Sequence, residues 1–113
     1  VSLFVDPIPA QIEAAAATDA NCVELHTGDF AEAPTEAAQR NEAERLAQAA
    51  EIAHEAGLRV HAGHGLNYRN LSLFRDMVPH VAEISIGFAI VARSVFVGLD
   101  QAVRDMRATM NGH

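Results

Sequence analysis

A histidine lies between two glycines near the middle of the chain, at Gly63, His64 and Gly65. Glycine adopts backbone conformations that other residues avoid, and it lets a ligand approach the main chain closely. A histidine in this setting is expected to project from an open loop rather than to pack in a core. Because the histidine side chain titrates near neutral pH, His64 is a candidate general acid or base.

A carboxylate and an imidazole lie two residues apart, at Glu24 and His26, in a short stretch with strand character. Side chains two apart in a strand point to the same face. If that face lines a pocket, the carboxylate can act as an acid, a base or a stabiliser of charge. The alternative is that these side chains merely cap neighbouring backbone amides. Polar residues at strand ends serve sites in parallel α/β folds, and both interpretations stay open.

Other polar residues bear on metal and phosphate binding. His61 and His64, with His26 as a third ligand, match no recognised zinc spacing. We therefore expect no metal site, and we interpret His61 as packed between a strand and a helix. Gly87, before a predicted helix from Phe88, is a candidate phosphate cradle because amides at a helix N-terminus favour anions. A plain turn is the simpler interpretation of this glycine alone.

Short apolar stretches that could position these residues predict strands at 1–5, 22–26, 58–62 and 82–86. Helices are predicted at 9–20, 36–56, 70–78, 88–96 and 99–110, with a loop at 30–35. Strands that alternate with helices indicate an α/β fold with a parallel sheet, whose strand ends gather on one rim. Four such units are half of an eight-unit barrel, and a small doubly wound sheet is the alternative.

The apolar spacing within the helices predicts their buried faces. These faces are Leu46, Ala50 and Ala53 in the long helix, Leu71, Phe74 and Val78 in the next, and Leu99, Val103, Met106 and Met110 in the last. Gly57 is expected to end the long helix, as a glycine just past a helix end does. Asn70 is expected to cap the helix that follows it through its side chain.

The composition is that of one globular domain. Half of the 113 residues are hydrophobic and a fifth are charged, which is ordinary for a chain long enough to form a core. The net charge of −7 argues against a nucleic-acid surface, and no apolar run approaches the ~20 residues that span a membrane. The single cysteine, Cys22, is expected to be buried and suits a reducing cytoplasm. Because the chain begins without Met inside an apolar run, we expect it to be a piece of a longer protein.

The chain closely resembles the pyridoxine 5'-phosphate synthase family. Blocks that carry the resemblance, in this order, are 1–6 (VSLFVD), 23–28 (VELHTG), 62–68 (AGHGLNY) and 84–90 (ISIGFAI). The glycine-histidine-glycine block is the most specific of them. The resemblance implies that residues 1–113 form a single domain, the C-terminal (βα)4 half of a (β/α)8 TIM barrel that assembles as an octamer.

The resemblance also implies an activity in vitamin B6 biosynthesis. The family condenses 1-deoxy-D-xylulose 5-phosphate with 3-amino-2-oxopropyl phosphate to form pyridoxine 5'-phosphate, inorganic phosphate and water, without a cofactor. The resemblance places the proton donor at His64 and a carboxylate that stabilises the transition state at Glu24. It places substrate binding at Gly65 and at the phosphate-binding pair Gly87 and Phe88. The implied partners are phosphorylated small molecules and further copies of the chain, not nucleic acid or a membrane.

The chain departs from the family pattern at residues 61 and 88. The second member of the phosphate-binding pair is commonly histidine and is Phe88 here, and the common asparagine at position 61 is His61. If the backbone amide at 88 holds the phosphate, binding survives the change, whereas affinity falls if an imidazole is needed. The general-base histidine and glutamate and the phosphate-binding arginines of the family lie in its N-terminal half, and no residue here replaces them.

Two hypotheses follow for the chain. It is a pyridoxine 5'-phosphate synthase chain or a portion of one, or it is a catalytically inactive half-barrel that acts as a folding and assembly module. If these 113 residues are the whole polypeptide, the first and last strands are expected to be open, apolar edges that recruit another chain. Leu3 or Val5 and Val23 or Leu25 are expected to face the barrel interior and to lose the opposite half of their core. We therefore expect the chain alone to form an inactive oligomer.

Overall fold

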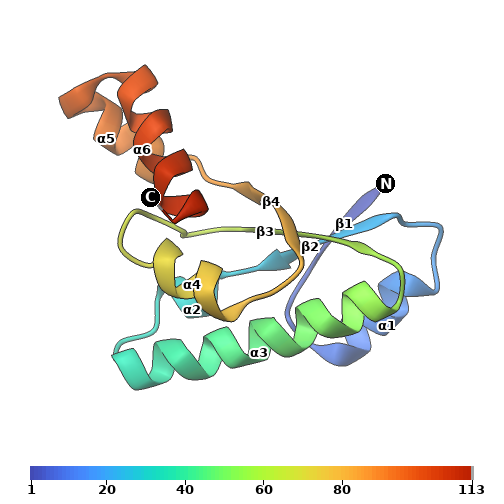
Figure 1. The fold of residues 1–113 in the computed structure, drawn as a ribbon. Coiled ribbons are helices and arrows are strands. Elements are labelled where there is room, and N and C mark those ends of the chain that lie inside the picture. The colour runs from blue at the N-terminus through green and yellow to red at the C-terminus, as the bar shows by residue number, and fades with distance from the viewer. Residues whose placement is uncertain (113) are drawn as a thin grey trace.

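A computed structural model describes residues 1–112, in which parallel strands alternate with helices (Figure 1). The strands are β1 (Ser2–Val5), β2 (Cys22–His26), β3 (Arg59–Gly63) and β4 (Val81–Ser85). The helices are α1 (Pro9–Ala16), α2 (Gly28–Ala31), α3 (Glu36–Glu55), α4 (Leu71–Met77), α5 (Phe88–Val97) and α6 (Leu99–Asn111). The predicted α/β class is confirmed, and each predicted strand is present to within a residue at either end.

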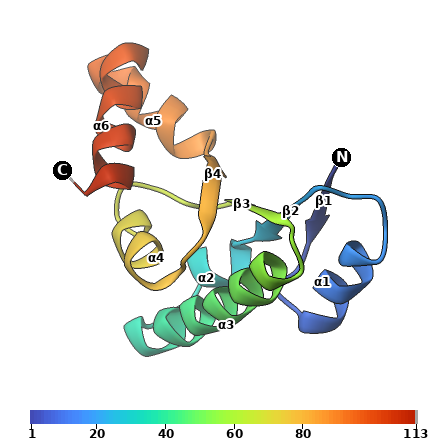
Figure 2. The same ribbon diagram turned by 45° about the vertical axis from the view of Figure 1, so that its right-hand side comes forward.

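The sheet has the order β1-β2-β3-β4, and every neighbouring pair is parallel. A doubly wound sheet reverses its strand order at a switch point and carries helices on both faces. Here α1 to α4 lie on one face of the sheet, as two views of the molecule show (Figures 1 and 2). Sequential strands with helices on one side are the geometry of successive units of a barrel. The chain is therefore an α/β half-barrel.

The hydrophobic core lies between the sheet and this helical layer. Val23 and Leu25 of β2 are fully buried, as are Val60 and Ala62 of β3. The helix α3 meets them with a stripe of small and apolar residues, Ala43, Leu46, Ala49, Ala50 and Ala53. The expectation that Val23 or Leu25 faces the barrel interior is therefore wrong, because the helices cover these positions.

The opposite face of the sheet, which is the barrel interior, carries polar side chains. Strand register aligns one row across it, which consists of Phe4, Glu24, His61 and Glu83. The interpretation of His61 as packed between strand and helix is wrong, because its neighbours Val60 and Ala62 take the helical side. A shift in register between Val60 and His61 brings Glu83 opposite His61. Phe4, at the end of this row, is 58% exposed.

The segment after β2 differs from the prediction of a loop at 30–35. The short helix α2 begins at Gly28 and includes Phe30, whose ring is buried and packs edge-on against Phe74 at a centroid distance of 6.0 Å. After α3, Gly57 has a φ of 82° and ends the helix as expected. Burial of Phe30 explains the difference, since folding this segment into a helical turn brings its ring into the core.

The expected side-chain cap of α4 is absent from the described structure. Asn70 instead stabilises the preceding loop, where its Oδ1 accepts from the amide of Asn67 at 2.8 Å. Its Nδ2 donates to the carbonyl oxygen of Gly65 at 3.1 Å. The side chain of Asn70 therefore stabilises the loop that contains His64 and does not cap the helix that follows.

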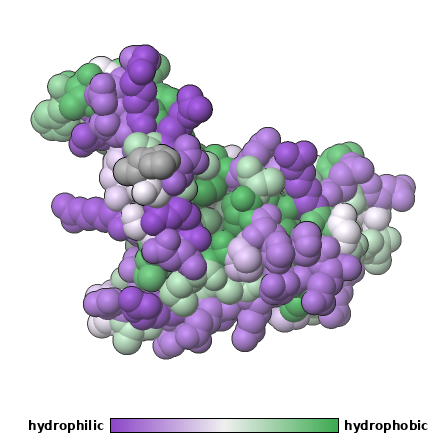
Figure 3. Space-filling model, in the orientation of Figure 1, coloured by the Kyte–Doolittle hydropathy of each residue, from purple (hydrophilic) through white to green (hydrophobic). Residues whose placement is uncertain are grey.

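The helices α5 and α6 form a pair that projects away from the helical layer (Figures 1 and 2). In α6, Ala102 and Met106 are buried, whereas Leu99 and Val103 are exposed, so the predicted stripe is only partly correct. The apolar helix α5 exposes Phe96 to 88%, and Figure 3 shows apolar surface on this projecting pair. No helix within residues 1–112 is long and apolar enough to cross a membrane.

Candidate active site

A cavity of about 380 Å³ opens where the carboxyl ends of β3 and β4 meet. Its walls are His64, Gly65, Leu66, Asn67, Ser85, Ile86, Gly87, Phe88 and Ala89. The structure thus brings together His64, Gly65 and the pair Gly87–Phe88, which the sequence places in one site. The volume lies in the range of pockets for small molecules, roughly 300–1,000 Å³.

The His64 loop is held in an unusual backbone conformation. His64 has a φ of 103° and an exposed side chain, as the predicted open loop requires. The hydroxyl of Thr27, a fully buried residue, donates to the carbonyl oxygen of His64 at 2.6 Å. Gly65 has a φ of 77°, and a Cβ there would lie 2.6 Å from the Cβ of Ala31. The fold itself therefore requires glycine at position 65.

The imidazole of His26 stacks on that of His64, with ring centroids 4.6 Å apart and planes 25° from parallel. Phe4 meets the His26 ring edge-on at 5.1 Å. The amide of Gly28 donates to Nδ1 of His26 at 3.4 Å, so Nδ1 is the acceptor of this hydrogen bond. A Cβ at Gly28 would lie 2.4 Å from Cε1 of His26, so glycine is needed beside the stacked rings.

Glu24 lies one row below His26 on the same face of β2, as the spacing predicts. The hydroxyl of Ser85 donates to Oε1 of Glu24 at 3.3 Å. A Cβ at Gly63 would lie 3.3 Å from Oε2 of Glu24, so the glycine leaves room for the carboxylate. Ser85 also lines the cavity, whereas Glu24 is not among the lining residues. Glu24 is therefore connected to the cavity through its hydrogen bond with Ser85.

The N-terminus of α5 forms the other end of the cavity. The amide of Val91 donates to the carbonyl of Gly87 at 3.0 Å, which is the first bond of the helix. The amides of residues 88–90 precede this bond and have no partner inside the helix. Phe88 is 90% exposed and is one of the residues that line the cavity. No described atom lies within 4 Å of a Cβ built at Gly87, which leaves space beside these amides.

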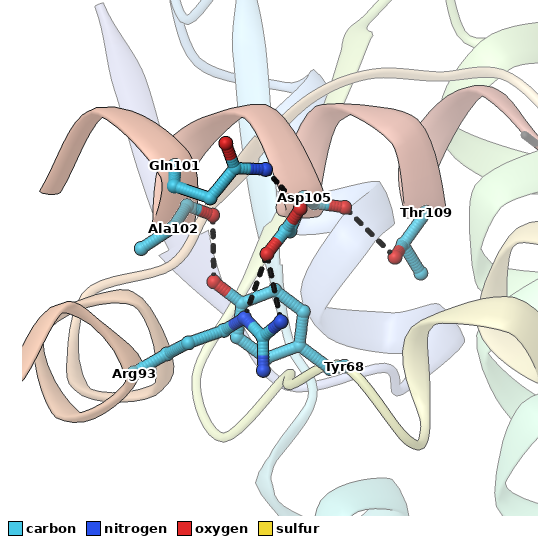
Figure 4. A network of polar contacts seen from close by, with 6 residues as sticks. All are labelled: Tyr68, Arg93, Gln101, Ala102, Asp105 and Thr109. Carbon is cyan, nitrogen blue, oxygen red and sulfur yellow. Dashed lines mark hydrogen bonds and ion pairs between the residues drawn. The ribbon is translucent and has the colours of Figure 1, made fainter. Parts of the chain in front are cut away.

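A polar network fixes α5 against α6 and the His64 loop (Figure 4). Arg93 of α5 donates from Nε to Oδ2 of Asp105 at 2.8 Å, and Gln101 donates to Oδ1 at 2.7 Å. These bonds, that of Gln101 first, lower the pKa of the Asp105 carboxyl. The Arg93 guanidinium also lies 5.0 Å from the ring of Tyr68, whose hydroxyl donates to the carbonyl of Ala102 at 2.7 Å. Burial raises the pKa of this hydroxyl, which therefore stays a donor.

The histidines of the site do not form a metal centre in the described part of the chain. Among residues 1–112, no three His, Cys, Asp or Glu side chains are arranged to hold a metal ion. His61 lies 3.7 Å from Oε2 of Glu83, which is too far for a hydrogen bond. Its buried Nε2 has no hydrogen-bond partner within the same residues. His26 and His64 stack face to face instead of converging on one point.

Thr27 and Ser85 have structural roles in the site that the sequence patterns did not indicate. Thr27 holds the carbonyl of His64, and Ser85 holds the carboxylate of Glu24. Both follow or end a strand, and that position is the signal by which they could have been found. Neither partner is near in sequence, because the two hydrogen bonds join residues 37 and 61 positions apart.

Known proteins match the chain over nearly its full length. The family described as "Pyridoxal phosphate biosynthesis protein PdxJ" matches residues 1–112. A relative from Salinibacter ruber, named pyridoxine 5'-phosphate synthase, is 79% identical over 110 residues, which are 97% of this chain and 45% of the relative. Relatives of the same name from Idiomarina loihiensis and Opitutus terrae are 54% and 49% identical, each over 44% of its own length.

The matches also show what share of each relative's length the chain covers. It spans less than half the length of the curated relatives it matches. The half-barrel geometry agrees with this share, because four parallel units are present where a complete barrel has eight. The chain therefore belongs to the PdxJ family of TIM-barrel proteins.

Proposed function

We propose that the chain forms the C-terminal half of a pyridoxine 5'-phosphate synthase. In the proposed reaction, 1-deoxy-D-xylulose 5-phosphate condenses with 3-amino-2-oxopropyl phosphate to give pyridoxine 5'-phosphate, inorganic phosphate and water. The single observation that carries the proposal is the cavity at the strand ends, which gathers His64, Gly65, Gly87 and Phe88. The names of the relatives support the same reaction.

His64 is the proton donor in this proposal. Ring formation with loss of water requires a proton on the hydroxyl that leaves, and a positioned imidazole supplies it as a general acid. The exposed ring of His64 stands on the cavity wall, where a bound substrate can reach it. Condensation of an amine with a carbonyl also develops positive charge. The carboxylate of Glu24, oriented by Ser85, can stabilise that charge.

The phosphate group is held at the N-terminus of α5. The amides of residues 88–90 have no partner inside the helix, and the free space beside Gly87 lets an anion approach them. The positive end of the helix dipole favours the same occupant. Gly65 adds a stretch of main chain without a side chain on the facing wall. A phosphorylated substrate thereby lies between the α5 amides and His64.

The remaining groups of the reaction come from outside this chain. The family resemblance assigns the general base and the phosphate-binding arginines to the N-terminal half of the barrel, so the chain alone is inactive. Copies of the complete protein associate in the family, and we extend this to the present chain. We also place the reaction in the cytoplasm, which suits the buried, free thiol of Cys22.

The proposal is tested with a barrel fusion, in which the N-terminal half of the Salinibacter ruber relative is joined to this chain. The expected result is formation of pyridoxine 5'-phosphate from the two phosphorylated substrates, with release of inorganic phosphate. The full-length relative serves as the positive control, and the fusion with Glu24→Gln as the matched variant of reduced activity. A folded fusion that makes no product, beside an active relative, would overturn the proposal.

The second candidate function is that of an inactive assembly module. The exposed apolar side chains of α5, among them Phe88, Val95 and Phe96, favour it because such surfaces mark contacts with other chains. The barrel fusion separates the two functions. Product formation by the fusion excludes the inactive module, whereas a folded and inactive fusion that still associates supports it.

A further inference from the structure

We propose that His26 is a positioning residue that holds the imidazole of His64 in the orientation needed for proton transfer, an inference that rests on the proposed role of His64. An exposed histidine on a glycine loop can rotate about both side-chain bonds. The ring of His26 stacks on one face of the His64 ring, with the centroids 4.6 Å apart. This contact restricts the rotation of the His64 side chain. His26 ends β2, so the sheet carries the wall against which His64 lies.

His26 is itself fixed on several sides. The edge-on ring of Phe4 contacts it at 5.1 Å, and the amide of Gly28 donates to its Nδ1. A side chain at Gly28 would enter the space of Cε1 of His26 and would come within 3.1 Å of Cδ2 of His64. The two rings therefore pack as one unit against the glycine. This packing gives His26 a defined plane to present to His64.

The main chain and the ring of His64 are controlled by different contacts. Thr27 holds the carbonyl oxygen of His64 and so fixes the loop. The hydrogen bonds of residues 1–112 leave the ring nitrogens of His64 unengaged, and the stack on His26 is the ring contact that orients them. A proton donor works only when it is within reach of its acceptor, and a displacement of about 1 Å can lower turnover by ~10²-fold.

The test compares two variants of His26 in the barrel fusion. His26→Leu removes the flat ring, and we expect kcat to fall by ~10–100-fold with little change in KM. His26→Phe keeps a flat ring against His64 and should retain most of the activity. The matched control is His54→Leu, because His54 stacks on His80 at 3.8 Å outside the site. This control should leave kcat unchanged.

A second readout reports on the stack without relying on catalysis. In the NMR spectrum of the fusion, the carbon-bound ring protons of His64 should shift upfield under the ring current of residue 26. The shift should persist in His26→Phe and disappear in His26→Leu. Gly28→Ala, which forces the His26 ring aside, should reproduce both effects of His26→Leu and serves if that variant fails to fold.

The outcomes separate this inference from the proposed function. If His26→Leu loses the NMR shift but keeps full kcat, while His64→Ala is inactive, the positioning role of His26 is overturned. If His64→Ala keeps full kcat, the proposed role of His64 fails, and the positioning role of His26 fails with it even where the NMR signature confirms the stack. Equal loss of kcat in the Leu and Phe variants would also overturn positioning by the ring.

Discussion

The backbone strain of the site is concentrated in His64. A φ of 103° in a residue other than glycine costs about 1–3 kcal/mol, and the surrounding structure must compensate for it. Here the buried hydroxyl of Thr27 provides part of that compensation through its bond to the His64 carbonyl. His80, which lies outside the site, has a φ of 68°. Positive φ alone therefore does not identify a site, and His64 is distinguished by its place on the cavity wall.

Removal of the His64 imidazole tests the proton donor directly. In the barrel fusion, His64→Ala should lower kcat by ~10²–10⁴-fold, because that is the contribution of a positioned general acid. KM should change much less, since Gly65 and the α5 amides still contact the substrate in the proposed site. Steady-state kinetics measure both values, with His54→Ala as a control on the exposed surface of α3. An unchanged kcat in His64→Ala would exclude the role.

Phe88 tests whether a backbone amide or a side chain holds the phosphate. Phe88→His restores the residue that is common in the family, yet we expect only a modest change in KM for a phosphorylated substrate. The reason is that Phe88 is 90% exposed, and the amides at the start of α5 are proposed to hold the phosphate. Phe96→His, at the other end of α5, is the matched control. A drop in KM of tenfold or more in Phe88→His alone would show that an imidazole contributes.

Part of the site could be predicted from the sequence because it depends on local spacing. The rest could not, because it depends on contacts between residues that are far apart in the sequence. Two-residue spacing in a strand placed Glu24 and His26 on one face, and flanking glycines marked His64 as a loop residue. The hydrogen bonds that orient these groups come from Thr27 and Ser85, which are far from their partners in sequence. Such contacts depend on strand register, which local spacing does not specify.

At the scale of elements, periodicity identified each strand and the long helix but not what covers each face. In α6 the apolar stripe includes Leu99 and Val103, yet the buried residues are Ala102 and Met106. The difference arises because α6 packs on α4 and α5 through the face that carries Ala102 and Met106, so Leu99 and Val103 lie outside the contact. In β2, Val23 and Leu25 were assigned to the wrong face. Both faces of a strand are buried in a complete barrel, so apolar residues alone do not show which face points to the interior.

The Arg93–Asp105 pair holds α5 in place and makes its stability depend on pH. The pKa of Asp105 is lowered by Gln101 and Arg93. The contribution of the Asp105 carboxylate to stability is therefore fully present above the ordinary pKa of aspartate, roughly 3.9. It is lost as the pH falls through the lower pKa that Asp105 has in the folded protein. Asp105→Asn should reduce the melting temperature slightly at pH 7. The difference from the parent chain should shrink below about pH 3.9, as followed by circular dichroism.

Asp100→Asn is the matched control for this experiment. Asp100 pairs with Arg104 within α6 at 2.8 Å, and both side chains are exposed. Exposed pairs of this kind contribute little to stability, so the control should melt with the parent chain at either pH. If Asp105→Asn lowers the melting temperature by the same amount at pH 7 and pH 3, a role for the charge is contradicted. It would indicate that the substitution acts through packing instead.

At the scale of the molecule, the half-barrel leaves surfaces that a complete barrel would cover. The strands β1 and β4 are the edges of the sheet, with backbone groups free to pair with another strand. The interior face carries the polar row that includes Glu24 and His61, so it needs a partner with polar groups rather than an apolar core. On the projecting α5, Val95 and Phe96 are exposed. Apolar surface on the projecting pair of helices is visible in Figure 3.

These surfaces predict that the 113-residue chain, prepared alone, associates with itself and has no synthase activity. The open edges drive the association, and burial of the exposed α5 side chains adds about 25 cal/mol for each Å² of apolar surface removed from water. Two copies can pair their edges, but they supply only second copies of Glu24 and His64 and no group of the N-terminal half. Light scattering coupled to size-exclusion chromatography should therefore detect oligomers, and addition of the separate N-terminal half of the Salinibacter ruber relative should replace them with an active complex. A folded monomer would refute the association, and product formation by the chain alone would refute its inactivity.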